Sequence, residues 1–470
     1  MKKFLCAILA LVMILSLAAC GGETEKKPTE PSTPTVPEKP TGTQLWEKAD
    51  ELPKSGDYKL TCDVTVTESI YVEDSLILDL NGFTITRSVS ADELTDQQAI
   101  RAPEGTSLTI KDTSAEGKGT MKVSYPAGTQ CVSPAALIHG DETSVIVIDG
   151  GTYDCAGMES IYASANGGVF ATGGKLTINK AVVYGYKNVA SGTSGCGTVL
   201  GIWSDGEVII NDGKFVGGGS KGNAATIASK GILTINGGEF SVDAALTGNV
   251  SRHAALILTE MNSARTTSLT INGGTFTGAQ VEHGGGCFNA ACPTTITGGT
   301  FYAGQAYQGG VILANKQPLT VTGGTFYGKE GATTNVGGII SALGKTLTIT
   351  GGTFNGVNDS NHGYNVFYDY VGGQLTIGGD AKLNGGVAVR SLSPKICAML
   401  NITGNPQIST ADKTVGTAKY AIKLSNADLC IEKQPTEAKS GVAEATKTNY
   451  MLAELIYDAE GNITGAKNSD

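Results

Sequence analysis

The chain has 470 residues, a formal net charge of −10 and 65 glycines. The acidic balance, with no basic stretch interleaved with aromatic residues, excludes nucleic acid as an expected partner. This many glycines without the three-residue period of collagen indicate a chain that turns very often.

The first residues have the layout of a secretory signal. Two lysines precede an almost unbroken apolar run over residues 4–17, which is too short to span a membrane comfortably. The sequence Leu17-Ala18-Ala19-Cys20 follows, and it resembles the lipobox of bacterial lipoproteins. The resemblance implies removal of a signal peptide over residues 1–19 and transfer of lipid to Cys20. We therefore expect an extracytoplasmic protein that is anchored by lipid to the bacterial cell membrane and exposed at the surface.

Residues 20–43 follow the lipobox and are rich in proline, threonine and glutamate, with almost no apolar side chains. Such a segment cannot bury a core, so we expect an extended tether.

An internal repeat occupies most of the remaining chain. The phrase Leu-Thr-Ile/Val-Asn/Thr-Gly-Gly-x-Phe occurs at Leu233–Phe240, Leu269–Phe276, Leu319–Phe326 and Leu347–Phe354, and degenerate copies surround these. Its third, aliphatic residue recurs as closely as 25 residues apart, for example from Ile271 to Ile296. A second apolar segment, such as Gly310–Ile312, lies about ten residues before each copy. Each repeat thus holds three short strands.

Three short strands in 25 residues, without any helical pattern, predict an all-β fold. We expect a single-stranded parallel β-helix of about twelve coils over residues 58–435. A β-propeller is the alternative, but its blades need four strands and about forty residues. We expect an N-terminal cap over residues 44–57, with a short amphipathic helix over residues 43–52. Residues 436–470 are expected to form a C-terminal cap or tail.

The strand alternation assigns a side to each residue of the repeat. The leucine and isoleucine of Leu-Thr-Ile should face inward and the threonine outward. The following Asn or Thr should form a polar ladder at a corner, the glycine pair should supply unusual backbone angles, and the phenylalanine should stack inside. Because these residues recur in nearly every coil, we interpret them as structural and not as metal ligands.

The opening coil also carries a resemblance. Leu78-Asp-Leu-Asn-Gly-Phe-Thr-Ile85 resembles the first coil of right-handed, pectin-lyase-like β-helix proteins. Those relatives include enzymes that cleave acidic polysaccharides with clustered aspartates, or with a calcium site and a basic side chain. This chain has no Asp-Asp pair, and Asn361-His362-Gly363 only faintly resembles the Gly-His-Gly element of such hydrolases.

The sequence assigns no catalytic residue and no cofactor. The four histidines, His139, His253, His283 and His362, are widely spaced, and no Cys-x-x-Cys pair is present. We therefore predict no metal site; Ca²⁺ is compatible with the fold but nothing indicates it. Cys287 occupies the place of an aliphatic residue in later coils, and we expect it to pack as a small apolar side chain.

Three tyrosines are the candidate ligand-binding residues. Tyr302 and Tyr327 each follow a core phenylalanine on consecutive coils, and Tyr184 holds the same place further up. Outward aromatic rings can stack on sugar rings, although such a pair also simply favours a β-surface. We predict a non-catalytic protein that binds polysaccharide or mediates adhesion to a cell-surface partner. The alternatives are a polysaccharide lyase or glycoside hydrolase acting on an acidic polysaccharide, and a purely architectural rod.

Overall fold

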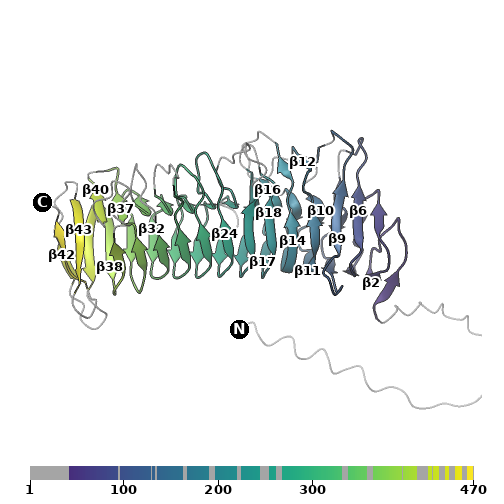
Figure 1. Cartoon of the computed structure of the whole chain (residues 1–470), viewed down its shortest axis with the longest axis horizontal. Coiled ribbons are helices and arrows are strands. Elements are labelled where there is room, and N and C mark those ends of the chain that lie inside the picture. The colour runs from purple at the N-terminus through teal and green to yellow at the C-terminus, as the bar shows by residue number, and fades with distance from the viewer. Residues whose placement is uncertain are drawn as a thin grey trace, which may run out of the picture. The chain divides into compact units, whose positions relative to one another are not determined.

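The structure is a computed structural model that describes residues 42–470 apart from residues 94–95, 129, 133–134, 162–166, 190–195, 220–223, 244–252, 261–266, 331–336, 357–363, 394, 410–421, 426, 433–439, 444–449, 458–462 and 469–470. Thr43–Asp470 forms one compact unit, and its described part is a parallel β-solenoid without helices (Figure 1). Within these ranges no helix is long and apolar enough to cross a bilayer.

Each full coil contributes three strands, as the repeat predicts. The first strands of the coils form a sheet of fifteen strands, of which all but β43 and β44 are parallel neighbours. In chain order they are β4 (Ile70–Tyr71), β7 (Ile100–Ala102), β10 (Ala135–Gly140), β13 (Gly168–Thr172), β16 (Cys196–Ile202), β19 (Ala224–Ser229), β22 (Ile257–Thr259), β25 (Phe288–Ala290), β28 (Ile312–Ala314), β31 (Ile340–Ala342), β34 (Val366–Asp369), β37 (Val387–Arg390) and β40 (Ile422–Ser425).

The second and third strands share a sheet of 27 strands, because β11 and β14 run through the corner between them. The second strands are β2 (Gly56–Leu60), β5 (Ser75–Asp79), β8 (Ser107–Lys111), β11 (Val145–Asp154), β14 (Lys175–Tyr184), β17 (Glu207–Ile210), β20 (Ile232–Ile235), β23 (Ser268–Ile271), β26 (Thr294–Ile296), β29 (Leu319–Val321), β32 (Thr346–Ile349), β35 (Gln374–Ile377), β38 (Ala398–Thr403) and β41 (Ala427–Glu432). The third strands are β3 (Val64–Val66), β6 (Thr84–Ser88), β9 (Thr120–Ser124), β18 (Lys214–Gly217), β21 (Glu239–Val242), β24 (Thr275–Thr277), β27 (Thr300–Tyr302), β30 (Thr325–Tyr327), β33 (Thr353–Asn355), β36 (Lys382–Asn384) and β39 (Gln407–Ser409).

Different pairings occur at the C-terminal end. There β42 (Ser440–Ala443) pairs antiparallel with β41, and β43 (Tyr450–Tyr457) pairs antiparallel with β40 and with β44 (Ile463–Asn468). A separate two-stranded sheet joins β12 (Glu159–Ser160) to β15 (Lys187–Asn188).

The inward side chains form continuous stacks, as predicted. Ile235, Ile271 and Ile296 are in register and fully buried. Six phenylalanines stack one above another, with ring centroids 4.5 to 5.0 Å apart: Phe215, Phe240, Phe276, Phe301, Phe326 and Phe354. The second glycine of each pair has a positive φ, for example 102° at Gly274, which an L side chain rarely adopts. Cys287 is also fully buried in this core, as expected.

The predicted polar ladder is present at the corner between the second and third strands. The amide of Asn211 donates to Asn179 at 3.0 Å, that of Asn236 to Asn211 at 2.8 Å, and that of Asn272 to Asn236 at 2.9 Å. The hydroxyl of Thr297 then donates to Asn272 at 2.8 Å. Five consecutive coils therefore share one hydrogen-bonded row, which confirms a structural role for these residues.

The predicted N-terminal helix over residues 43–52 is wrong. Residues Gln44–Trp46 instead form β1, which pairs parallel with β2. The backbone of this segment adds one strand to the sheet beyond β2, and Trp46 packs edge-on against Tyr58 at a centroid distance of 5.0 Å. Its indole N–H donates to the carbonyl of Glu51 at 3.0 Å. Pairing with an open strand edge thus outweighs the helical pattern of a short segment.

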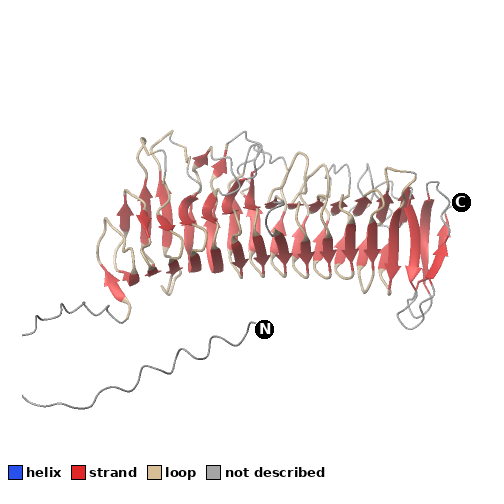
Figure 2. Ribbon diagram, turned by 180° about the vertical axis from the view of Figure 1, so that it is seen from behind, coloured by secondary structure: helices blue, strands red, loops and turns tan. Residues whose placement is uncertain are grey.

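Most long connections leave the coil at one corner, after the third strand. The segments between β6 and β7, between β9 and β10, and between β27 and β28 are examples. Figure 2 shows the longer loops rising along one edge of the row of strands. Inserted residues therefore lengthen the repeat without changing the register of the flat faces.

Candidate functional site

The candidate site is a pair of tyrosines on the third strands of two adjacent coils. Tyr302 ends β27 and Tyr327 ends β30, and the two residues are direct partners in the parallel ladder. Because the preceding phenylalanines face the core, strand alternation turns both tyrosines outward. Their side chains are 44% and 37% exposed. Their rings stack with centroids 5.1 Å apart and planes inclined by 11°.

This geometry decides which parts of the rings a ligand can reach. Within the pair, one face of each ring is turned toward the other ring. The outer face of Tyr302 lies on the side of Thr277, and that of Tyr327 on the side of Asn355, since these residues are the next partners in the row. Thr277 is exposed and small. A sugar ring can therefore extend the stack beyond Tyr302 or contact the hydroxyl-bearing edges of both rings.

The third predicted residue, Tyr184, does not join this pair. It is half-buried, and its partners in the row are Asp154 and Val216. Val216, Ser241 and Thr277 hold the same place on the coils between Tyr184 and Tyr302. The structure thus brings two of the three candidate tyrosines together.

A further exposed tyrosine was not predicted. Tyr307 lies in the connection from β27 to β28, and its side chain is 46% exposed. Its ring lies edge-on to the imidazole of His283, with the ring centroids 6.5 Å apart. It falls outside the repeated phrase, so the alternation rule gave it no orientation. The only sequence signal was an aromatic residue within a short Gly- and Gln-containing insertion. Three exposed tyrosines therefore come from two neighbouring coils.

The histidines are dispersed. His283 is exposed beside Glu282 in a connection, His253 lies in another connection, and His139 is buried in β10. His362 lies outside the described residues. Burial, and then the positive charge of Arg101, lower the pKa of His139, so its imidazole is neutral at neutral pH.

A surface group of charges lies around Arg101, on the outer side of the first-strand sheet. Its guanidinium binds both carboxylate oxygens of Asp141, at 3.0 and 3.1 Å, and lies 3.4 Å from Asp96. It also lies 5.8 Å from the centre of the Tyr71 ring. Both carboxylates are thus held in ion pairs with the same guanidinium. The arrangement ties three coils together, and His139 Nε2 lies 3.9 Å from the Asp141 carboxylate.

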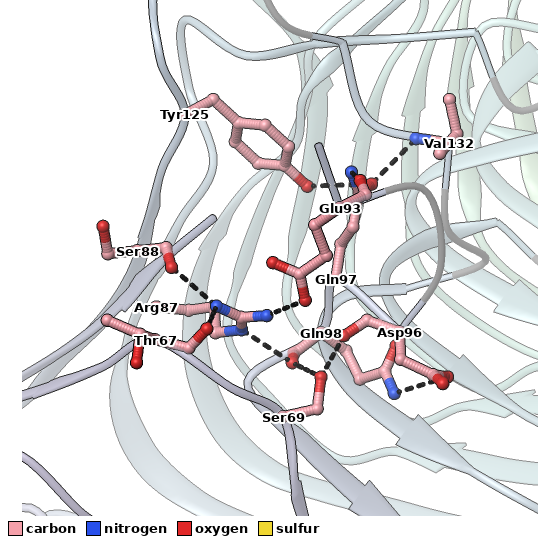
Figure 3. A network of polar contacts seen from close by, with 10 residues as sticks. All are labelled: Thr67, Ser69, Arg87, Ser88, Glu93, Asp96, Gln97, Gln98, Tyr125 and Val132. Atoms are coloured by element: carbon pink, nitrogen blue, oxygen red, sulfur yellow. Dashed lines mark hydrogen bonds and ion pairs between the residues drawn. The ribbon is translucent and has the colours of Figure 1, made fainter. Parts of the chain in front are cut away.

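A second charged group is internal. Arg87 is completely buried, where it is ion-paired with Glu93 and donates to the carbonyls of Thr67 at 2.7 Å and Ser88 at 2.6 Å (Figure 3). A further bond reaches the carbonyl of Gln98 at 3.3 Å. Since the protein itself accepts these bonds, the guanidinium fastens a connecting loop and leaves little for an anionic ligand.

Among the described residues, no group of three or more histidine, cysteine, aspartate or glutamate side chains is placed to hold a metal ion. Comparisons of the chain with known proteins gave no matching protein family, no matching curated protein and no matching solved structure.

Proposed function

We propose that this chain is a lipid-anchored bacterial surface protein with a pectin-lyase-like solenoid that binds polysaccharide and thereby adheres to glycan-bearing surfaces, without chemistry of its own. The observation that carries the proposal is the stacked, exposed pair Tyr302 and Tyr327. Aromatic faces attract the slightly positive C–H groups of a sugar ring, and a pair held in one stacked arrangement loses little freedom on binding.

The position of the pair supports this role. Tyr302 and Tyr327 lie on rigid, in-register strands, and Tyr307 adds a third exposed ring from the adjoining connection. Binding groups on rigid strands keep their geometry better than groups on loops. Scattered exposed aromatic residues need no explanation, but a stacked pair on adjacent coils, with a third exposed ring in the adjoining connection, is a feature that a binding surface would have.

The test is affinity electrophoresis of the full chain, held in mild detergent, through gels that contain single plant, host or bacterial polysaccharides. We expect retardation by at least one polymer. Tyr302→Ala combined with Tyr327→Ala should weaken binding about tenfold, since each aromatic contact contributes about 0.5–1.5 kcal/mol. The melting temperature should change little, because both rings lie outside the core.

Tyr184→Ala is the matched control, since it removes a tyrosine from the same row on a distant coil. It should leave retardation unchanged. If the double variant binds as tightly as the original chain, these two tyrosines are not the site. Soluble oligosaccharides released from any polymer, detected by mass spectrometry, would replace the binding proposal with that of a polysaccharide-cleaving enzyme.

The anchor rests on the sequence alone, because Cys20 lies outside the described residues. Two or three acyl chains hold a protein firmly at a membrane, since each buried methylene adds about 0.8 kcal/mol. Cys20→Ala should therefore shift the protein from the membrane fraction of expressing bacteria to the medium, as measured by immunoblotting. Retention of the variant in the membrane at the original level would contradict lipid anchoring at this residue.

A further inference from the structure

One stretch of the solenoid surface, which covers the second and third strands and the corner between them, carries no charge over four consecutive coils. It consists of the outward residues of β23, β24, β26, β27, β29, β30, β32 and β33, with the turns between each pair of strands, and we call it the neutral face. The segments that build it are residues 268–277, 293–302, 318–327 and 346–355. None of them contains Asp, Glu, Lys, Arg or His, and threonine is their commonest residue.

The parallel register arranges the polar groups of the neutral face in straight rows. Four such rows cross the four coils: Thr270, Thr295, Thr320 and Thr348; Asn272, Thr297, Thr322 and Thr350; Thr275, Thr300, Thr325 and Thr353; and Thr277, Tyr302, Tyr327 and Asn355. Neighbours within a row lie about 4.8 Å apart, the spacing of paired strands. The tyrosine pair is therefore part of a larger regular surface.

Charged residues resume at both ends of this surface. Lys214 and Glu239 occupy the third strands of the two preceding coils, and Lys382 occupies the following one. At the edges, Lys316 and Lys345 lie in the turns that precede β29 and β32, and Lys329 and Glu330 follow Tyr327 in the connection after β30. The neutral stretch thus coincides with the coils on which the tyrosines are paired.

On the basis of the function proposed above, we infer that the ligand of the neutral face is a neutral polysaccharide. A hydroxyl both donates and accepts hydrogen bonds, and so does an amide. Rows of threonine and asparagine side chains around two aromatic rings match a polymer whose surface consists of hydroxyl and C–H groups. Such a partner loses few hydrogen bonds when water is displaced from the interface.

An acidic polysaccharide fits this surface poorly. Its carboxylates would lose water against rows of uncharged side chains, with cations only at the edges of the face, and a charge that is left unpaired is costly to desolvate. The chain as a whole also carries a net charge of −10, which repels a polyanion. Binding to a neutral polymer should therefore depend little on salt and not at all on Ca²⁺.

The test compares two polymer sets by affinity electrophoresis of the full chain in mild detergent. The neutral set holds cellulose derivatives, mixed-linkage glucan, galactomannan and xylan, and the acidic set holds polygalacturonate, alginate and hyaluronate. We expect retardation by at least one neutral polymer, by no acidic polymer, and less than a twofold change in affinity between low and high salt or on addition of EDTA.

Two substitutions locate the site on the neutral face. Thr295→Val with Thr320→Val keeps the β-branched shape but removes two hydroxyls, and should weaken retardation several-fold without lowering the melting temperature. Thr109→Val with Thr177→Val makes the same change in the same row on distant coils, where Lys111 and Lys175 lie beside the threonines, and should leave retardation unchanged.

The outcomes separate this inference from the proposed function. Retardation by acidic polymers alone, lost at high salt, would overturn the neutral ligand and leave polysaccharide binding intact. Retardation by no polymer in either set would overturn both. Concentration-dependent dimers in gel filtration that dissociate with the tyrosine double variant would show that a second copy covers the neutral face, which would also overturn the inference.

Discussion

Two buried serine hydroxyls differ in their hydrogen bonding because different groups surround them. Ser341 faces outward from β31, between Leu313 and Phe367 of the adjacent coils, and is nevertheless completely buried. Its hydroxyl has no hydrogen-bond partner among the described residues. The hydroxyl of Ser391 is equally buried but donates to the carbonyl of Ile396 at 2.7 Å and accepts from the amide of Ser393 at 3.2 Å.

We therefore expect opposite effects from the same substitution at these two positions. Ser341→Ala should leave the free energy of unfolding unchanged or raise it by up to about 1 kcal/mol, because it removes a buried polar group without a partner. Ser391→Ala should lower it by about 1–2 kcal/mol, because it leaves an amide and a carbonyl unpaired. Urea unfolding monitored by circular dichroism measures both. A loss at Ser341 as large as that at Ser391 would contradict the difference in hydrogen bonding.

At the scale of the element, the phenylalanine stack joins the third strands into one unit. Phe301 is completely buried. Its ring centroid lies 5.0 Å from that of Phe276 and 4.5 Å from that of Phe326, and the Phe288 ring packs edge-on at a centroid distance of 5.8 Å. Removing its ring leaves a cavity bounded by rigid neighbours on both sides, so the site cannot easily collapse.

Phe301→Ala should accordingly lower the free energy of unfolding by about 3–5 kcal/mol, at the upper end for a core substitution. Phe301→Leu keeps most of the volume and should cost less than about 1.5 kcal/mol. The measurement is denaturant unfolding of both variants beside the original chain. Similar losses in the two would mean that stacking geometry, and not cavity volume, determines the stability of this row.

Some of the strands could be predicted from the sequence and other elements could not. The strand Leu269–Ile271 and its copies were predictable because alternation, turn glycines and the core phenylalanine agree with one another in every copy. The helix expected over residues 43–52 failed because the open edge of β2 recruits this segment as β1. The burial of outward residues such as Asn289 and Ser341 could not be predicted, because it depends on what covers the first-strand sheet and not on the strands themselves.

At the scale of the whole molecule, each coil contacts mainly the coils before and after it. Because the same sequence repeat determines the structure of one coil and of the coil that packs on it, the solenoid could be predicted from the period of the repeat. The candidate site was only half predictable from that period. The pairing of Tyr302 with Tyr327 follows from the repeat, whereas Tyr307 lies in a connection that differs from coil to coil. The grouping of residues from such segments becomes visible only in three dimensions.

The concentration of long connections at one corner divides the molecule into a constant and a variable part. Three sides of each coil are built to a common pattern, and a change there disturbs the neighbours above and below. A connection such as that from β27 to β28 can gain or lose residues, or exchange Tyr307 for another side chain, while the rod stays the same. Chains of this architecture can therefore diversify along a single edge, much as fixed frameworks elsewhere carry interchangeable loops.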